Sequence, residues 1–249
     1  MNARAQLALP VRLRDHATFD TFDALAQPLL VAELRAAAAG PEGRQPTWLW
    51  GPRGSGRSHL LQAVCAAAVA AGHAAAYLPL KDLLALGPGM LEGQERAAVV
   101  GLDDLDEAVG AGAPWREALF ALHNAVREAG GWLVFTTTTA PSAFASGLAD
   151  LDSRLAAAAV HRLNPLDDTG LMRALAARAT RLGLELPEET ARWLLVRAPR
   201  DAAHLFALLD RLDAAALQAQ RRLTVPFVRE VLATETSPGE PGGSAASRS

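Results

Sequence analysis

Short apolar runs alternate with longer segments of helical period over the first two thirds of the chain. The short runs are bounded by glycine, proline or acidic residues, as strands buried on both faces are. The expected strands span 47–50, 74–80, 97–102, 132–137 and 160–163, and the expected helices span 27–39, 58–71, 81–86 and 114–129. Repeated strand–helix alternation predicts an α/β fold with a five-stranded parallel sheet and helices on both faces.

The pattern changes after Asn164-Pro165-Leu166, where only helical periodicity continues. The helices expected there span 167–182, 188–196, 201–220 and 225–233. They predict a small helical bundle appended to the sheet domain, which is called the lid below. The last residues are rich in glycine, proline and serine, a composition typical of disorder. The expected organisation is an N-terminal arm at 1–17, an α/β domain at 18–164, a lid at 165–234 and a disordered tail at 235–249.

Composition limits the classes of function that remain. The 249 residues carry a formal net charge of -3, which argues against a strongly basic nucleic-acid surface. Cys65 is the only cysteine, so the chain builds no disulfide framework and no cysteine-based zinc site. The six histidines are scattered without metal-site spacing. No apolar run is long enough for a membrane span, and no signal peptide is recognisable. We therefore expect a cytoplasmic protein.

A glycine-rich stretch follows the first expected strand and opens a helix. It fits the phosphate-loop pattern G-x-x-x-x-G-K-[ST], with arginine at position 57 in place of lysine. Glycines let backbone N–H groups turn toward phosphate oxygens, and the helix N-terminus adds positive potential. An accidental glycine turn is the alternative. The expected nucleotide-binding residues in this stretch are Gly51, Gly54, Gly56, Arg57, Ser58 and His59.

Acidic residues follow the third expected strand, at the edge of the sheet where ligands bind in doubly wound folds. Asp103 and the hydroxyl of Ser58 are the expected neighbours of a phosphate-bound Mg²⁺ ion. Asp104 is a candidate for polarising an attacking water. The alternative is that these acids only solvate the end of a strand. The threonines at 136–139 raise the same choice, because they orient a water or phosphate, or serve as ordinary strand residues.

Two arginines are candidates for contact with a phosphate. Arg154 lies in Leu151-Asp152-Ser153-Arg154-Leu155 and is a candidate arginine finger, which acts on a nucleotide held by a neighbouring subunit. A surface salt bridge to Asp150 or Asp152 is the alternative. Arg200 begins a helix of the expected lid and can reach a nucleotide from there, although arginines at helix starts are mostly solvated.

The N-terminal arm contains Gln6-Leu7-Ala8-Leu9-Pro10, a short extended segment with two apolar side chains. One interpretation is that Leu7 and Leu9 pack on the protein's own surface. The other is that the segment docks into an apolar pocket of another protein. The pattern alone favours the first interpretation.

The order of these motifs resembles the AAA+ ATPases, and among them the DnaA-type replication initiators. The similar stretches are Gly51 to Ser58, Leu102-Asp103-Asp104, the strand ending in Thr136-Thr137, the box from Asp150 to Leu155, and Arg200. More closely, the chain resembles the Hda family of DnaA-related regulatory inactivators over about residues 3–233. That resemblance rests also on Gln6 to Pro10, on Gly56 to Leu61 and on Leu223 to Val228.

The resemblance implies a negative regulator of DNA replication initiation. Members of the Hda family bind the DNA-loaded sliding clamp, the polymerase β subunit, and stimulate hydrolysis of ATP held by DnaA. By this resemblance Gln6, Leu7, Leu9 and Pro10 bind the clamp, and Arg154 is the finger supplied in trans to DnaA. Arg200 then senses this protein's own nucleotide, which is expected to be ADP.

Two departures from the wider family pattern bear on catalysis. Arg57 replaces the usual lysine, an exchange that Hda-like proteins share, and Thr138 stands where many DnaA-like proteins carry an acid. Both argue against vigorous self-hydrolysis and favour an activator of the partner's ATPase. The chain also has no room for a basic helix-turn-helix domain after the lid, so a dedicated sequence-specific DNA-binding domain is not expected.

Two other classes of protein stay open at the level of sequence. One is a self-oligomerising DnaA-like or clamp-loader-like ATPase with its own hydrolysis. The other is a nucleotide-free interaction module that kept the fold. The choice between ADP and ATP, the presence of Mg²⁺ and self-association also stay open.

Overall fold

A computed structural model describes residues 17–22, 27–199 and 202–236. The predictions for the clamp-binding motif at residues 6–10, for Arg200 and for a tail beyond residue 236 lie outside these described residues. The chain divides into two compact units, Met1–Gly170 and Leu171–Ser249, and each is described by itself below.

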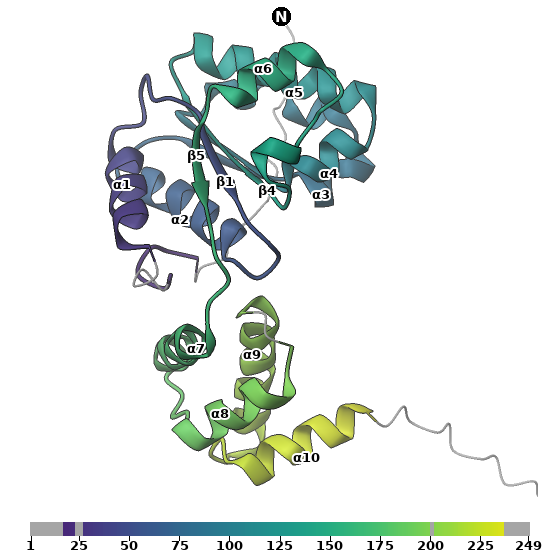
Figure 1. Ribbon diagram of the computed structural model, residues 1–249. Coiled ribbons are helices and arrows are strands. Elements are labelled where there is room, and N and C mark those ends of the chain that lie inside the picture. The colour runs from purple at the N-terminus through teal and green to yellow at the C-terminus, as the bar shows by residue number, and fades with distance from the viewer. Residues whose placement is uncertain (1–16, 23–26, 200–201, 237–249) are drawn as a thin grey trace, which may run out of the picture. The chain divides into compact units, whose positions relative to one another are not determined.

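The first unit is built on a five-stranded, fully parallel sheet (Figure 1). Its strands are β1 (Thr47–Trp50), β2 (Ala75–Pro79), β3 (Val99–Asp103), β4 (Trp132–Thr137) and β5 (Ala159–Arg162). Their order across the sheet is β2-β3-β4-β1-β5. The sheet confirms the predicted five-stranded parallel architecture, and each strand lies within two residues of its expected bounds.

Helices cover both faces of this sheet, as predicted. Those of the first unit are α1 (Pro28–Ala39), α2 (Arg57–Ala70), α3 (Leu80–Leu83), α4 (Leu105–Gly110), α5 (Ala113–Glu128) and α6 (Ala149–Ala156). Short 3₁₀ segments span Leu84–Leu86, Pro88–Leu91, Gln94–Arg96 and Pro141–Ala143. In Figure 1, α1 and α2 lie on one side of the sheet and α3 to α6 on the other. The sequence pattern did not predict α4 and α6 as helices.

Each face of the sheet has its own apolar core, because side chains alternate between faces along a strand. On the face of α1 and α2, the strands contribute Leu49, Val99, Trp132 and Val134. On the face of α3 to α6, they contribute Trp48, Val100, Leu102, Leu133 and Phe135. Helix α2 lies close against β3 at Gly101, where an added Cβ would stand 3.0 Å from Leu61 Cδ1.

The second unit is helical, with α7 (Asp168–Leu182), α8 (Glu188–Arg197), α9 (Ala202–Ala219) and α10 (Val225–Thr236). Helix α7 begins just before the boundary between the units. Leucines form most of the core of this unit, among them Leu175, Leu194, Leu209 and Leu212. Arg178 makes a bidentate ion pair with Asp210, at 2.7 and 2.8 Å from Nη2, which ties α7 to α9. We refer to this unit as the lid.

Across the described part of the chain, no helix combines the length and apolar character that crossing a membrane would require.

Candidate functional site

Three segments meet at the carboxyl edge of the sheet, because β4 lies between β1 and β3. They are the loop from Gly51 to Gly56 that connects β1 to α2, the acids that begin at Asp103, and the threonines that end β4. The sequence placed all three at this edge, and the structure brings them into hydrogen-bonding contact, as described below. Ligands bind at this edge in doubly wound sheets.

The loop requires glycine at three positions for different reasons. Gly54 and Gly56 have φ angles of 80° and 85°, in the left-handed region that favours glycine. A Cβ added at Gly51 would lie only 2.3 Å from the carbonyl oxygen of Leu163, the residue that follows β5. The chain therefore turns tightly from β1 into α2, whose first residue is Arg57.

Two buried donors at this loop make no hydrogen bond within the described protein. They are the hydroxyl of Ser55 and Nη1 of Arg57, and these residues are only 4% and 7% exposed. No described side chain caps the start of α2 either, so N–H groups of its first turn stay available. Unpaired buried donors are destabilising, and an anion would satisfy them. These residues therefore fit a phosphate group.

Asp103 is held by two hydroxyl groups from neighbouring strands. Its Oδ2 accepts a 2.6 Å hydrogen bond from the hydroxyl of Tyr77, and its Oδ1 accepts one of 2.6 Å from Thr136. The amide of Gln62 in turn donates to the Tyr77 oxygen at 3.2 Å. The carboxylate is thus buried with both of its oxygen atoms engaged. Tyr77 and Gln62 were not predicted as site residues, although a tyrosine near the carboxyl end of a strand beside Asp103 was a usable signal.

Asp104 faces the loop and pairs with its arginine. Its backbone is left-handed, with a φ of 54°, and its N–H donates to the Thr136 hydroxyl at 2.8 Å. Its Oδ1 lies 3.3 Å from Nη1 of Arg57. Burial, and then the nearby charge of Asp103, raise the pKa of Asp104, and Arg57 opposes that rise. The carboxylate that was predicted to polarise water is therefore the counter-ion of the loop's own cation.

The threonines at the end of β4 serve the fold. Thr136 links Asp103 to the backbone of Asp104. The Thr137 hydroxyl accepts from Trp48 Nε1 at 2.8 Å and donates to the carbonyl of Thr139 at 2.7 Å. Thr138 donates to Asp106 through both its N–H and its hydroxyl. These contacts favour the structural interpretation of 136–139 over the orientation of a water or phosphate.

Residues 17–22 pack on the first turn of α2. His59, predicted to bind nucleotide, places Nε2 3.0 Å from the carbonyl oxygen of Thr18 and 3.1 Å from the hydroxyl of Thr21. A Cβ added at Gly56 would lie 2.8 Å from the ring of Phe22. The side chain of His59 therefore holds this segment against the loop, whereas Ser58 is partly exposed beside it.

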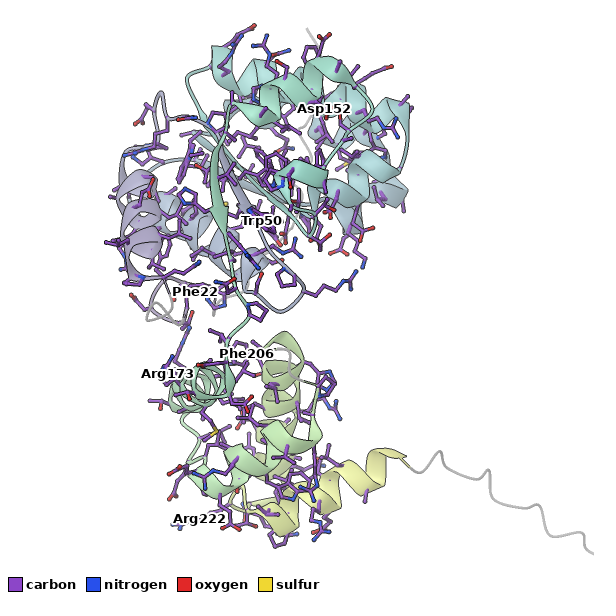
Figure 2. All side chains as sticks on the ribbon, in the orientation of Figure 1. Phe22, Trp50, Asp152, Arg173, Phe206 and Arg222 are labelled. Carbon is purple, nitrogen blue, oxygen red and sulfur yellow. The ribbon has the colours of Figure 1, made fainter. Side chains whose placement is uncertain are left out.

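Arg154 lies on α6, at the opposite edge of the sheet from the loop. Helix α6 ends at Ala156 and β5 starts at Ala159, so Arg154 is near the start of that strand. In Figure 2, Asp152 of α6 and Phe22 beside the loop mark opposite ends of this unit. Arg154 makes no hydrogen bond or ion pair with any residue in the described ranges. Asp152 instead accepts from the N–H of Ser146 at 2.7 Å, so the predicted alternative of an Arg154–Asp152 salt bridge is absent.

Comparisons with known proteins agree with this architecture. Residues 167–232 match the family model of the Hda lid domain. Domain III of the replication initiation protein DnaA from Thermotoga maritima is similar over 91% of this chain and 100% of its own, with 20% identity and a TM-score of 0.76. AMPPCP-bound DnaA from Aquifex aeolicus is similar over 80% of this chain and 65% of its own, with 18% identity and a TM-score of 0.65.

The chain therefore shares the fold of DnaA domain III, and its residues 167–232 match the Hda lid domain. A variant of RuvB from Thermotoga maritima shares the fold more distantly, with 17% identity and a TM-score of 0.63 over 89% of this chain and 72% of its own. Likenesses at these identities establish the fold.

The fit of a metal ion to this site is poor. Within residues 17–22, 27–199 and 202–236, no group of three or more histidine, cysteine or acidic side chains is placed to hold one. The predicted ligands are Ser58 and Asp103, and the carboxylate of Asp103 already accepts two hydroxyl hydrogen bonds. The nearby Asp104 is paired with Arg57. The residues present therefore fit an anion better than a cation.

Proposed function

We propose that this protein is a negative regulator of DNA replication initiation that acts on DnaA. In this proposal it holds ADP in the loop after β1 and binds the DNA-loaded sliding clamp through Gln6, Leu7, Leu9 and Pro10. It then stimulates hydrolysis of ATP bound to DnaA by inserting Arg154 as a trans-acting arginine finger. The match of residues 167–232 to the Hda lid domain supports this choice among AAA+ functions.

The observation that carries the proposal is the position of Arg154. The guanidinium has no hydrogen-bond or ion-pair partner among the described residues, and α6 lies at the opposite edge of the sheet from the loop. A cation so placed is available to a nucleotide on another molecule. The two acids beside this protein's own loop, Asp103 and Asp104, are in contrast engaged by Tyr77, Thr136 and Arg57. This arrangement supports chemistry in the partner's site.

The first test is turnover of DnaA-bound ATP in the presence of sliding clamp, DNA and this protein. Arg154→Ala is expected to lose most of the stimulation, because fingers of this kind contribute roughly 10³- to 10⁵-fold to the rate. Its melting temperature should stay that of the parent, since the side chain makes no ion pair in the described protein. Arg127→Ala, at an exposed arginine of α5, is the control and should stimulate normally. Full stimulation by Arg154→Ala would refute the finger.

The second test concerns the clamp. The double variant Leu7→Ala with Leu9→Ala is expected to abolish binding to DNA-loaded clamp, measured by surface plasmon resonance, because two apolar anchors are removed. Stimulation of DnaA should fall with it. Substitution of Leu29, an exposed leucine of α1, by alanine is the control for loss of an apolar surface side chain. Unchanged clamp binding by the double variant would contradict the assignment of residues 6–10.

The rival function is an ATPase with its own turnover and self-assembly. That function needs a free carboxylate beside the attacking water, whereas Asp104 is paired with Arg57 at 3.3 Å. The pairing disfavours the rival. Appreciable ATP turnover by the isolated protein that Asp104→Asn abolishes would restore it.

A further inference from the structure

The polar groups at the carboxyl edge of the sheet divide into donors that make no hydrogen bond and carboxylates that are already engaged. The Ser55 hydroxyl and Arg57 Nη1 are buried and lack hydrogen-bond partners in the described protein. A guanidinium carries donors only, so it binds phosphate and never a metal ion. Asp103, at the same edge of the sheet, is the carboxylate that a phosphate-bound metal would need. The donors therefore suit a negatively charged ligand, whereas each oxygen of Asp103 already accepts a hydroxyl hydrogen.

Two hydroxyl groups oppose the binding of a metal ion at Asp103. Tyr77 and Thr136 each direct a hydroxyl hydrogen at one oxygen of Asp103, both at 2.6 Å. A hydrated Mg²⁺ ion would have to compete with those hydrogens through its own water molecules, at a carboxylate that is 5% exposed. Mg²⁺ also dehydrates reluctantly and requires near-octahedral geometry. Gln62 donates to the Tyr77 oxygen and so holds that hydroxyl in place.

Asp104, the second acid at this edge, is also engaged, in an ion pair with Arg57. Asp104 lies 3.3 Å from Arg57, and its left-handed backbone is fixed by the hydrogen bond from its N–H to Thr136. Releasing Asp104 to a metal would leave Arg57 buried without its counter-ion, which is strongly destabilising. One carboxylate oxygen nearby is unpaired, Oδ1 of Asp106, but the other oxygen of that residue is held by Thr138.

Resting on the proposed function, we propose that the loop binds a nucleoside diphosphate without a divalent cation, the guanidinium of Arg57 supplying the positive charge that a metal would supply. Arginine suits this task because its planar fork binds two phosphate oxygens at once and stays charged at any relevant pH. On binding, the diphosphate shares Arg57 with Asp104 and pairs the Ser55 hydroxyl. Arg57, which stands where the loop pattern has lysine, then supplies the positive charge in place of a metal ion.

The test is titration of ADP into the nucleotide-free full-length protein by isothermal calorimetry, in MgCl₂ and in EDTA at matched ionic strength. The expected ratio of the two Kd values is below about threefold, which corresponds to under about 0.7 kcal/mol. A larger ratio in favour of Mg²⁺ overturns the inference while leaving ADP binding intact. Absence of ADP binding in both buffers overturns ADP binding itself, and the inference with it. The two failures are thus distinguishable.

Two variants locate the cause. Tyr77→Phe removes the hydroxyl that donates to Oδ2 of Asp103. The Kd for ADP in EDTA is then expected to exceed the Kd in MgCl₂ by more than about threefold. An unchanged ratio would show that the hydroxyl does not exclude the ion and would overturn the argument from Asp103. A second variant, Asp106→Asn, applies if ADP binding by the parent depends on Mg²⁺. Loss of that dependence in the variant would show that Asp106 binds the ion, which also overturns the inference.

The role of the guanidinium has its own variant. Arg57→Gln is expected to lose ADP binding in both buffers, whereas Arg192→Gln, at an exposed arginine of the lid, should bind as the parent does. The melting temperature without nucleotide shows whether Arg57→Gln remains folded, as it must for the comparison. A folded Arg57→Gln protein that binds ADP normally in EDTA would overturn the assignment of the positive charge to Arg57.

Discussion

Asp104 illustrates what a single residue decides in this protein. Its left-handed backbone turns the carboxylate toward Arg57, and aspartate tolerates that conformation because its side chain is short and polar. The sequence predicted an acid at this edge of the sheet. It did not predict the ion pair, because nothing in the sequence indicates that residue 104 leaves the extended conformation or that Arg57 reaches it. The role of Asp104 in polarising water stays a prediction, and the ion pair with Arg57 is a contact that the sequence did not indicate.

His123 permits a prediction about pH. It is 4% exposed, and both ring nitrogens lack hydrogen-bond partners among the described residues. Burial, and then the charges of Arg154 and Arg127, lower its pKa from the ordinary value of 6.5. The unfolded chain therefore binds a proton below pH 6.5 that the folded protein does not bind, so stability falls as the pH drops below that value. The melting temperature should decrease between about pH 7 and about pH 5.5.

The matched variant is His123→Leu, which removes the titrating ring from the apolar core. Its melting temperature should depend less steeply on pH over the same range, measured by differential scanning fluorimetry at constant ionic strength. An identical slope in parent and variant would show that other groups carry the pH dependence.

At the scale of elements, the loop between β1 and α2 is fixed by packing as much as by any ligand. Gly51 lies against the carbonyl of Leu163, whose N–H donates to the Trp50 carbonyl at 2.7 Å. β1, the loop and the chain that leaves β5 are therefore locked together. Gly56 likewise lies under Phe22. The glycines fit both a phosphate-binding function and this close packing, and the sequence alone does not separate the two.

Gly51→Ala is expected to destabilise the protein by about 1–3 kcal/mol, because the new Cβ would overlap a backbone carbonyl that cannot move without shifting β5. The free energy of unfolding from urea denaturation measures the effect. Gly89→Ala is the control, since nothing lies within 4 Å of its added Cβ, and its effect should stay within about 0.5 kcal/mol. Equal stability of the two variants would refute the packing argument.

Most of the elements could be predicted, because apolar runs and helical periods specify burial directly. The strand at Thr47–Trp50 was predicted at its observed bounds. The bounds of the lid helices α7 and α8 were predicted to within one residue at each end. Helix α4 was missed because Leu105 lies within the acidic stretch Asp103-Asp104-Leu105-Asp106, which resembles a strand end. The hydroxyl contacts of Asp103 depend on the order of the strands, which the sequence pattern did not specify, although the place of Tyr77 near a strand end hinted at one of them.

At the scale of the whole molecule, the sheet unit and the lid each have their own core. The lid is held by leucines together with the pair Arg178–Asp210, in which the arginine side chain is 12% exposed. The sheet unit depends on two apolar layers, one on each face. Separate cores allow the two units to unfold in separate steps, as domains with their own cores commonly do.

Arg178→Gln is therefore expected to destabilise the lid by about 1–3 kcal/mol, because it breaks a bidentate charged hydrogen bond. Hydrogen exchange measured by mass spectrometry should show faster exchange in α7 and α9 and no change in β1 to β5. Arg192→Ala, which loses an exposed pair with Glu188, should change exchange little. Equal acceleration in the sheet would mean that the two units unfold together.

Tyr77 is the only tyrosine in the chain. Its hydroxyl lies against Asp103 at the carboxyl edge of the sheet. Growth on 3-fluorotyrosine would consequently place one fluorine atom in the protein, beside this carboxylate and nowhere else. A fluorine NMR spectrum would then contain a single protein resonance, whose chemical shift reports the state of the Tyr77–Asp103 contact. The molecule thus offers a single-site spectroscopic probe of the carboxyl edge of its sheet without any engineered label.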